Sequence, residues 1–491
     1  MMQKFRMRER GLDTRAESSR GLSCQNPQVA TRKKDKTALV LASGGLTGVA
    51  YEVGALRALD QILTNRTVND FDIYVGTSAG AVVTAALASG MPPIVLAGLL
   101  AGTVPGFTRL SRMQVYRPNV GEAFSRLLKA PNLVRQAALE YWQFRDRISM
   151  SEALLNLTPL LPSGIFTNRG IEEYVRETLQ TAGLSDDFRD IPRELHIVAT
   201  DIEADRRVTF SRHTTPDVPI STAVAASSCI PILFRPVEID GHHYVDGGIK
   251  GHAAIDVAIS RGAKLVVIIN GLVPLDTYAI AKRATTIEGQ RSIFDLGIRA
   301  IGNQVIRGML HDSLVDHLRE VRLKHPDVDF ILIEPNPDDE KMFFHEVMSF
   351  SAQMIVLQHG YETVTTGLPK TWPYLSRILP KHGIEVTRRV VARKPLQLPV
   401  DDMERGGNVV ARLFQTVLDR RNNAEGEKPD IRSAATPRQR ASDQGSAPRP
   451  PRKPARSKPM AAKTAAEARS TRRRPGFRPR VISGGESNTG G

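Results

Sequence analysis

The sequence predicts an α/β fold built around a parallel β-sheet, and features of its first hundred residues predict it. An apolar run from Thr37 to Ala42 has the character of a buried strand and leads into the glycine-rich loop Ser43 to Gly48. Apolar residues then recur at helical spacings of three or four: Val49, Val53, Leu56, Leu59 and Leu63. A second short apolar strand begins at Phe71. Strand, loop, helix and strand form a right-handed crossover, so the two strands lie parallel.

The second strand leads into a motif that presents a serine. Phe71 to Gly80 combines an apolar strand with Gly76-Thr-Ser-Ala-Gly80, the Gly-x-Ser-x-Gly pattern of a nucleophile elbow. Gly76 and Gly80 permit a sharp turn and a close approach of neighbouring backbone. Ser78 then stands exposed at a helix N-terminus, which makes it a candidate nucleophile.

The glycine-rich loop is expected beside the elbow, because both follow the carboxyl ends of adjacent parallel strands. An acyl-transfer nucleophile needs donors for the oxygen that becomes negative in the tetrahedral intermediate, and the backbone N–H groups of Gly44 and Gly45 are suited to this. A phosphate-binding loop is the alternative. The loop lacks both the G-x-G-x-x-G spacing and the Lys-Ser/Thr pair of nucleotide-binding loops, which argues against a nucleotide.

Further strands and helices alternate along the chain. Buried strands are predicted at 195–201, 264–270 and 328–333, with a shorter strand at 208–211. Helices are predicted at 171–179, at 220–231, between Ile293 and Leu318, and at 343–368.

A hairpin is predicted between Pro236 and Asp246. Two short strand runs flank Asp240-Gly241, which is a strong signal for a tight turn. Gly247 and Gly248 follow the second run, so the backbone after Asp246 is expected to approach another element closely. His196, inside the strand at 195–201, is interpreted as a core histidine.

Two segments allow more than one interpretation. No charged residue lies between Asp72 and Arg109, a run long enough for a membrane span. It contains Gly90 and Pro92-Pro93, which favours two buried helices separated by a break. Within residues 105–165, the stretch from Ala123 to Trp142 mixes apolar and basic side chains. It is either a lid or membrane-facing element, or a helix with one face on the core and its basic face in water.

The charge of the chain is concentrated at its ends. Of the formal net charge of +15 over 491 residues, residues 1–36 hold +6 and residues 423–491 hold +10, which leaves −1 for residues 37–422. Both ends are polar, so they are predicted to be disordered. Their basic side chains are suited to peripheral contact with an anionic membrane. Aromatic residues are nearly absent there, which argues against a specific nucleic-acid partner.

The cysteines and the N-terminal residues bear on the cellular compartment. Cys24 and Cys229 cannot form a disulfide framework, and residues 1–36 contain no apolar signal segment. The sequence therefore predicts a cytoplasmic location, with peripheral membrane contact as an extension of it. Oligomeric state is not predicted.

Five motifs in order resemble the patatin-like phospholipase family: Ser43 to Gly48, Gly76 to Gly80, Val198 to Asp201, Ala226 to Pro231 and Asp246 to Gly248. The resemblance spans about residues 37–368, with 369–422 as a C-terminal extension of the core. It implies a three-layer α/β/α fold with a mainly parallel central sheet. It also implies hydrolysis of lipid acyl esters, of the phospholipase A or lysophospholipase kind, without a metal or organic cofactor.

The same resemblance assigns roles to residues. Ser78 is implied as the nucleophile and Asp246 as its partner in a Ser-Asp dyad. The implied oxyanion loop is Gly44, Gly45, Leu46, Thr47 and Gly48, and the supporting glycines are Gly76, Gly80, Gly247 and Gly248.

Two departures from the family loop, Gly-Gly-Gly-x-Arg-Gly, bear on activity. Ser43 replaces the first glycine and Thr47 replaces the arginine. The backbone N–H donors remain whatever the side chains are. The family's loop geometry, and any contact of its arginine with an anionic substrate, cannot be carried over to this sequence. A catalytically weak module that binds membranes or a partner is therefore the alternative function.

A Ser-His-Asp triad is the alternative mechanism. His242, His243 and His252 lie near Asp246 in the sequence, and either Asp201 or Asp246 precedes His252 in the order expected for a hydrolase. Histidines in the hairpin are also expected simply as solvated surface residues.

Overall fold

The computed structural model describes residues 35–143, 149, 157–281 and 292–389, and the structural statements below concern these residues. The predicted tails, 1–36 and 423–491, lie almost entirely outside them, as does the greater part of the predicted extension 369–422. The proposed division of the chain into domains therefore stays a prediction.

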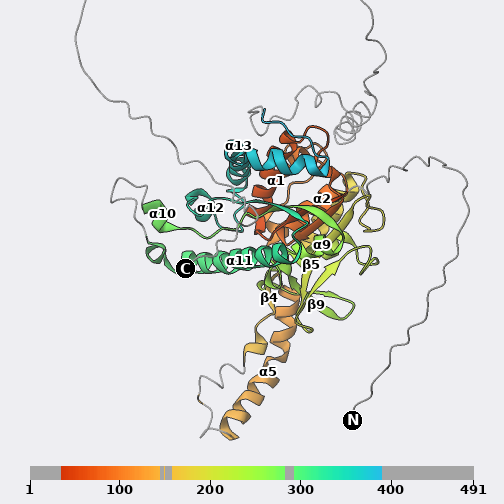
Figure 1. Ribbon diagram of the computed structural model, residues 1–491. Helices are drawn as coiled ribbons and strands as arrows, with labels where there is room; N and C mark the ends of the chain where they lie inside the picture. The colour runs from red at the N-terminus through yellow and green to blue at the C-terminus, as the bar shows by residue number, and fades with distance from the viewer. Residues whose placement is uncertain (1–34, 144–148, 150–156, 282–291, 390–491) are drawn as a thin grey trace, which may run out of the picture. The chain divides into compact units, whose positions relative to one another are not determined.

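An eight-stranded sheet forms the centre of the described structure (Figure 1). Its strands are β1 Lys36–Leu41, β2 Ile73–Thr77, β5 Glu194–Asp201, β6 Arg206–Phe210, β8 Val237–Ile239, β9 His242–Asp246, β10 Ala263–Ile269 and β11 Asp329–Ile333. They follow the order β11-β10-β1-β2-β5-β9-β8, and β6 also pairs with β5. The pairs from β11 to β5 are parallel, whereas β6, β8 and β9 pair in antiparallel fashion.

A second, three-stranded sheet has the order β3-β4-β7, with β3 Arg117–Pro118, β4 Gly164–Thr167 and β7 Ile232–Phe234. The helices are α1 Gly45–Ile62, α2 Ala79–Ala88, α3 Pro93–Ala101, α4 Arg112–Val115, α5 Val120–Gln143, α7 Arg169–Thr181, α8 Ile220–Ser227, α9 Ile255–Ser260, α10 Thr277–Ala281, α11 Gly297–Lys324, α12 Glu340–Phe344 and α13 Gln353–Ile378. Short 3₁₀ turns occur at Val68–Asp70, Thr158–Leu160, Gly247–Ile249, Ile293–Leu296 and Leu379–His382.

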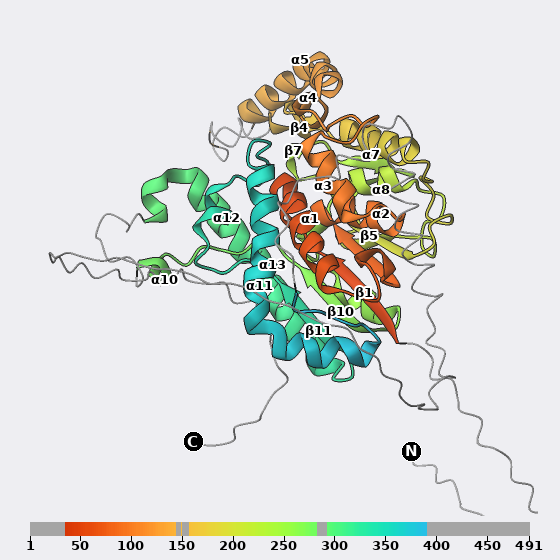
Figure 2. The same ribbon diagram turned by 90° about the horizontal axis from the view of Figure 1, so that it is seen from above.

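Apolar layers lie on both faces of the large sheet. Successive side chains of β1 point to opposite faces, so Leu39 and Leu41 join the core formed with α1, α2, α3 and α13. Ala38 and Val40 join a second, smaller core formed with α9 and α11. Figure 2 shows α13 running beside α1 on one face of the strands. The predicted three-layer α/β/α fold with a mainly parallel sheet is confirmed.

The uncharged stretch after β2 is confirmed as two buried helices, α2 and α3, with a break at Gly90 to Pro92. Among the helices described, none is long and apolar enough to cross a membrane. The helix predicted at 343–368 is wrong at both ends, because α12 stops at Phe344 and α13 begins only at Gln353 and continues to Ile378. The intervening segment turns back to the glycine-rich loop, where the carbonyl of Val347 accepts the N–H of Thr47 at 3.0 Å.

Helices α1 and α13 touch through two glycines. A Cβ atom on Gly54 would lie 2.0 Å from the carbonyl oxygen of Leu357, and one on Gly360 would lie 2.3 Å from that of Tyr51. Because backbone atoms cannot yield as a flexible side chain can, only glycine allows this approach. The contact fixes α1, and with it the glycine-rich loop at its N-terminus.

We expect Gly54→Ala to lower the free energy of unfolding by about 1–3 kcal/mol, because the added methyl group forces the two helices apart. Gly302→Ala in α11 is the matched control, since a Cβ atom there meets nothing within 4 Å. The control should be neutral or more stable by up to about 1 kcal/mol, since alanine favours the helix over glycine. Urea denaturation measures both. Equal losses for the two variants would contradict a tight crossing.

Candidate active site

The pairing along one strand, β5, determines where the two predicted catalytic side chains lie. β2 pairs with its first part, Glu194 to Val198, and β9 with its last part, Ala199 to Asp201. β6 pairs with residues 197–201 and so overlaps both. A strand has only two edges, so β2 and β9 share one edge of β5 end to end.

Ser78 and Asp246 meet at this junction. Thr77, the residue before Ser78, pairs with Val198, while Asp246 pairs with the next residue, Ala199. The Ser78 hydroxyl lies within hydrogen-bonding reach of the Asp246 carboxylate. The structure therefore brings together the two residues that the sequence named.

Ser78 has a backbone conformation that non-glycine residues rarely adopt. Its φ is 54° and its ψ is −116°, directly before α2. The flanking glycines make the turn feasible: a Cβ atom on Gly80 would lie 2.3 Å from the carbonyl oxygen of Leu41, and one on Gly76 would lie 2.1 Å from Thr84 Oγ1. The strained turn holds the side chain of Ser78 at the end of the sheet, as in a nucleophile elbow.

Two serines that the sequence analysis did not single out hold this turn. The N–H of Ser78 donates to Ser227 Oγ at 2.8 Å, and the Ser227 hydroxyl donates to the carbonyl of Val198 at 2.6 Å. The Ser228 hydroxyl donates to the carbonyl of Ser78 at 3.3 Å. Both serines lie in the motif Ala226 to Pro231, but nothing in that motif predicted these hydrogen bonds.

The carboxyl group of Asp246 is buried, and its pKa is raised to about 6. Burial is the main cause, because it disfavours the charged form. Hydrogen bonds from Ser78 and from the N–H of Gly248, at 2.7 Å to Oδ1, lower the pKa and offset part of the rise. Asp246 is thus a stronger base than an aspartate in water, which has a pKa of about 3.9.

The glycine-rich loop divides its backbone donors. The N–H of Thr47 donates to Val347 and that of Gly48 to the carbonyl of Gly44, at 3.0 and 2.8 Å. No acceptor among the described residues receives the N–H groups of Gly44, Gly45 and Leu46. Since the first N–H groups of a helix have no partner within it, those of Gly45 and Leu46 stay available at the start of α1.

The N–H of Ala79, at the start of α2, has no acceptor among the described residues either. The two helix starts lie next to each other, because the N–H of Gly80 donates to the carbonyl of Ala42 at 3.2 Å. Ala79 follows the candidate nucleophile, which is the position that supplies one oxyanion donor in a nucleophile elbow.

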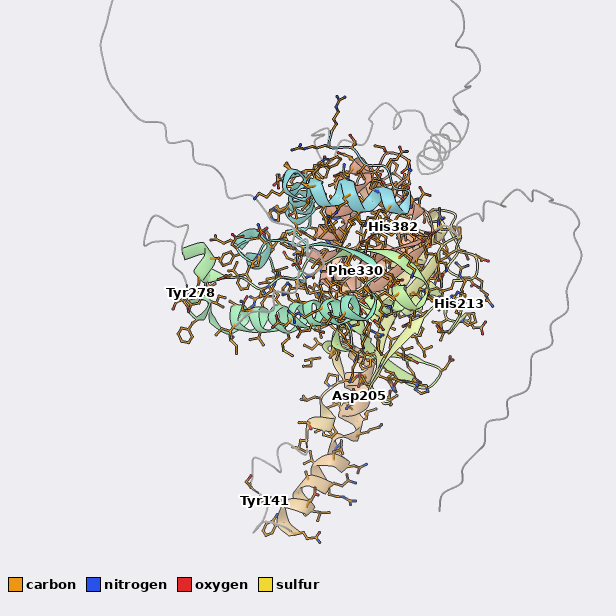
Figure 3. The ribbon with its side chains drawn as sticks, viewed as in Figure 1. Tyr141, Asp205, His213, Tyr278, Phe330 and His382 are labelled. Carbon is orange, nitrogen blue, oxygen red and sulfur yellow. The ribbon has the colours of Figure 1, made fainter. Side chains whose placement is uncertain are left out.

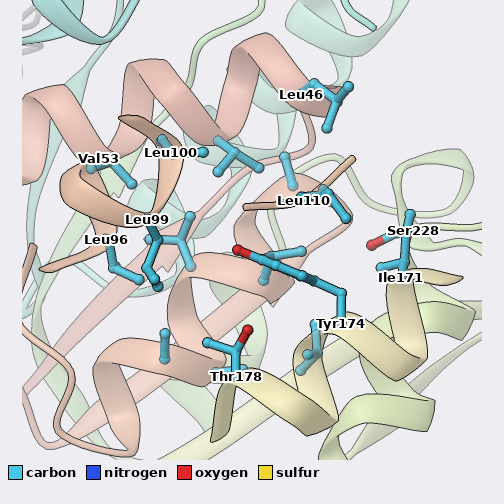
Figure 4. Close-up of a pocket in the computed structure, with 18 of the residues that line it drawn as sticks. Leu46, Val53, Leu96, Leu99, Leu100, Leu110, Ile171, Tyr174, Thr178 and Ser228 are labelled. Carbon is cyan, nitrogen blue, oxygen red and sulfur yellow. The ribbon is translucent and has the colours of Figure 1, made fainter. Parts of the chain in front are cut away.

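A largely apolar pocket opens onto these groups. It encloses about 1140 Å³ including its open mouth, and Gly45, Ser78 and Ala79 lie in its wall. Figure 4 shows side chains from three helices that converge on it: Leu46 and Val53 of α1, Leu96 and Leu99 of α3, and Tyr174 and Thr178 of α7. Arg109 is the only charged residue among those that line it in the described part of the chain.

Comparison with known proteins shows what this part of the chain is similar to. Residues 39–259 match the family model described as patatin-like phospholipase. This part of the chain is similar to patatin-like phospholipases. The match ends after α9 has begun, so it takes in Ser78, the glycine-rich loop and Asp246.

One curated relative of this chain is the "Probable lipid hydrolase 463L" of Invertebrate iridescent virus 6, 24% identical over 221 residues. The aligned part is 45% of this chain and 62% of the relative, so the chain spans about three fifths of that relative's length. Among solved structures, VipD of Legionella pneumophila aligns with 14% identity and a TM-score of 0.27, over 81% of this chain and 82% of VipD. The effector ExoU, known from Pseudomonas aeruginosa, aligns with 14% identity and a TM-score of 0.26, over 78% and 75%.

The first departure from the patatin loop, Ser43, takes part in a buried hydrogen-bond chain. Burial lowers the pKa of His252 to about 4, so its ring is neutral near pH 7. Its Nε2 lies 2.9 Å from Asn270 Oδ1, which also accepts the N–H of Leu272, so Nε2 is the donor. We therefore assign the Ser43 hydroxyl as donor to Nδ1, at 2.5 Å. These hydrogen bonds connect the glycine-rich loop to the segment after Asp246.

The second departure, Thr47, is buried. Its hydroxyl donates to the carbonyl of Val347 at 3.3 Å, alongside its own N–H. Val347 lies 300 residues further along the chain. No local signal in the sequence connects these segments.

The histidines of the alternative triad lie elsewhere in the described structure. His252 contacts Ser43, His242 Nδ1 lies 3.2 Å from Asp201, and His243 Nδ1 lies 2.7 Å from Glu203. Asp201 also accepts two backbone N–H groups in the turn after β5. None of the three histidines is placed beside Ser78, so the geometry favours the dyad. The described residues hold no group of three or more His, Cys, Asp or Glu side chains suited to a metal ion.

We expect Ser78→Gly to be more stable to unfolding than Ser78→Ala by about 1 kcal/mol. Both variants remove the hydroxyl, but only glycine adopts the positive φ of this turn without strain. Urea denaturation of the pair isolates the backbone effect from the loss of the hydrogen bond to Asp246. Equal stability of the two variants would show that the turn is unstrained.

Proposed function

We propose that this protein hydrolyses fatty-acyl esters of lipids, with Ser78 as nucleophile and Asp246 as general base. One observation carries the proposal: Ser78 pairs with a buried carboxylate and at the same time forms part of the wall of a largely apolar pocket. An ester bound with its acyl chain among these apolar side chains has its carbonyl group at Ser78.

In the first half of the reaction, Ser78 Oγ forms a bond to the ester carbonyl carbon while its proton passes to the Asp246 carboxylate. The carbonyl oxygen becomes negative and accepts hydrogen bonds from the N–H groups of Gly44, Gly45 and Ala79. The carbon–oxygen bond to the alcohol portion then breaks. The leaving oxygen takes the proton from Asp246, and an acyl-Ser78 ester remains.

In the second half, Asp246 accepts a proton from a water molecule as that water attacks the acyl-Ser78 carbonyl. The bond to Ser78 Oγ breaks, Ser78 recovers a proton from Asp246, and the fatty acid leaves. The pKa of about 6 suits both halves, because Asp246 is ionised near pH 7 and yet holds a proton better than an ordinary aspartate does.

The pocket supports a phospholipid or lysophospholipid as the substrate class. Its lining is apolar apart from a few polar groups, which suits an acyl chain. Arg109, an exposed cation in that lining, is suited to a headgroup phosphate and takes the place of the arginine that the loop lacks at Thr47. The corresponding location is the cytoplasm, where the protein acts at the membrane surface with its basic ends near anionic lipid.

Loss of either dyad residue should abolish hydrolysis. We expect Ser78→Ala and Asp246→Asn each to lower fatty-acid release from phospholipid vesicles and from a short-chain ester by about a thousandfold or more. His242→Ala and His243→Ala are matched controls that keep the wild-type rate, since both side chains lie away from Ser78. Retained hydrolysis by Ser78→Ala would refute the proposed nucleophile. A wild type that binds vesicles but hydrolyses no ester would instead favour the alternative, a weakly active or inactive binding module.

The pH dependence should show the raised pKa of Asp246. Below pH about 6 the carboxyl group is protonated and cannot accept the Ser78 proton, so kcat/KM should fall about tenfold per pH unit. Above pH 6 the rate should level off. An aspartate with an ordinary pKa would put this limb near pH 4. Hydrolysis of a soluble short-chain ester gives the profile, and circular dichroism at each pH confirms that the protein stays folded.

A further inference from the structure

Helix α5 presents its apolar side chains to solvent. Their spacing of three, four, seven or eight residues puts them on one face, which we call the exposed stripe. The stripe consists of Val120, Phe124, Leu127, Leu128, Val134 and Trp142, with exposed fractions of 68%, 61%, 67%, 67%, 48% and 71%.

The other face of α5 is polar or turned toward protein. Glu122 and Arg126 form an ion pair there, and Ala137 is the one buried side chain among the described residues of the helix. A helix that covers a core has the reverse arrangement, with apolar side chains inside. The interpretation of this stretch as a helix that packs its apolar face on the core therefore does not fit the exposure of the stripe.

The base of α5 is firmly attached to the domain. Burial raises the pKa of Glu122, but hydrogen bonds from Ser163, Asn119 and Arg126 outweigh this and bring it to about 2. Asn119 is buried and donates to the carbonyl of Gly164 in β4 at 3.1 Å. The ionised carboxylate thus joins the first turn of α5 to the small sheet.

The small sheet links α5 to the lipid pocket. Phe166 of β4 packs against Phe234 of β7 with ring centroids 6.3 Å apart, and Phe234 lines the pocket. On the outside of the same sheet, Ile165 and Ile232 are 56% and 82% exposed. The exposed stripe, these two isoleucines and the pocket are therefore parts of one connected region.

The segment between the pocket and α5 is exclusively positive. Between Asp72 and Glu122 the only charged residues are Arg109, Arg112 and Arg117, and all three are exposed. Arg109 lines the pocket itself. Cations next to an apolar face complement a surface of anionic headgroups over acyl chains.

We propose that the exposed stripe of α5 docks on an anionic lipid bilayer and so brings the pocket to its substrate; this rests on the proposed lipid hydrolysis. The helix lies along the interface, since no described helix has the apolar length of a membrane span and α5 carries charges on its other face. Figure 3 shows Tyr141 at the end of the helix away from the sheet, next in sequence to Trp142. Such aromatic residues favour the headgroup level of a bilayer.

Two double variants with equal charge test the stripe. Leu127→Glu/Val134→Glu puts two carboxylates on it, and Ser125→Glu/Gln136→Glu puts two on the polar face, where both residues are exposed. Co-sedimentation with vesicles of phosphatidylcholine and phosphatidylglycerol measures binding. The stripe variant should bind about tenfold more weakly or worse, while the control stays near wild type. Equal weakening of both would show that charge alone attracts the protein and would overturn the proposal.

A fluorescence experiment reports on the stripe directly. Trp142 and Trp372 are the only tryptophans in the chain, so Trp372→Phe leaves Trp142 as the reporter. Its emission should shift to shorter wavelength on addition of the same vesicles and be quenched by brominated acyl chains. An unshifted, unquenched Trp142 on bound protein would mean that another surface makes the contact.

Two further measurements separate the docking proposal from the proposed function and from other occupants. The stripe variant should keep wild-type hydrolysis of a soluble short-chain ester and lose hydrolysis of vesicles. If the wild type hydrolyses no ester, the proposed function fails, but the binding measurements still test the docking proposal. Light scattering gives the mass in solution. If the stripe variant converts a dimer to a monomer without weaker vesicle binding, the stripe joins two copies of this chain and the proposal fails.

Discussion

The junction of β2 and β9 on one edge of β5 is the constraint on which the site depends. Parallel pairing brings Thr77 to Val198, and antiparallel pairing brings Asp246 to Ala199. The two strands therefore run toward each other along this edge, their carboxyl ends meet, and both chain segments leave β5 at this junction. Ser78 and Asp246 are the residues at which they do so, which is why neither could move by one position without leaving the other.

The site is held by backbone more than by side chains. Gly247 lies so close to β5 that a Cβ atom would be 2.2 Å from the carbonyl oxygen of Val198, and Gly248 faces Ser43. The same rigidity permits the unfavourable features of the site, which are a positive φ at Ser78 and a buried carboxyl at Asp246. Such strain and desolvation persist only where the surrounding structure determines them, and here they raise the basicity of Asp246 and present the hydroxyl of Ser78.

The pocket is connected to its surroundings through the small sheet. Phe234 lines the pocket and packs against Phe166 of the small sheet, and β4 of that sheet accepts a hydrogen bond from Asn119 at the base of α5. Ionised Glu122 at that base, satisfied by hydrogen bonds, fixes the start of a helix whose apolar face is largely exposed. Attachment at one end and apolar exposure along the rest distinguish α5 from the helices that cover the sheet.

Local patterns in the sequence determined the alternation of strands and helices and the two turns at Ser78 and Asp240-Gly241, because each rests on residues within a few positions of one another. They also made Ser78 a candidate nucleophile, whereas Asp246 was predicted as its partner through the resemblance of five ordered motifs to a family. The tertiary structure alone decided which loop donors are available, since Thr47 donates to Val347, 300 residues away. It also decided that His252 serves Ser43 and that Ser227 holds the elbow. Tertiary structure also decided which way the stripe of α5 faces. Periodicity determines which residues share a face, but only packing decides whether that face meets a core or solvent.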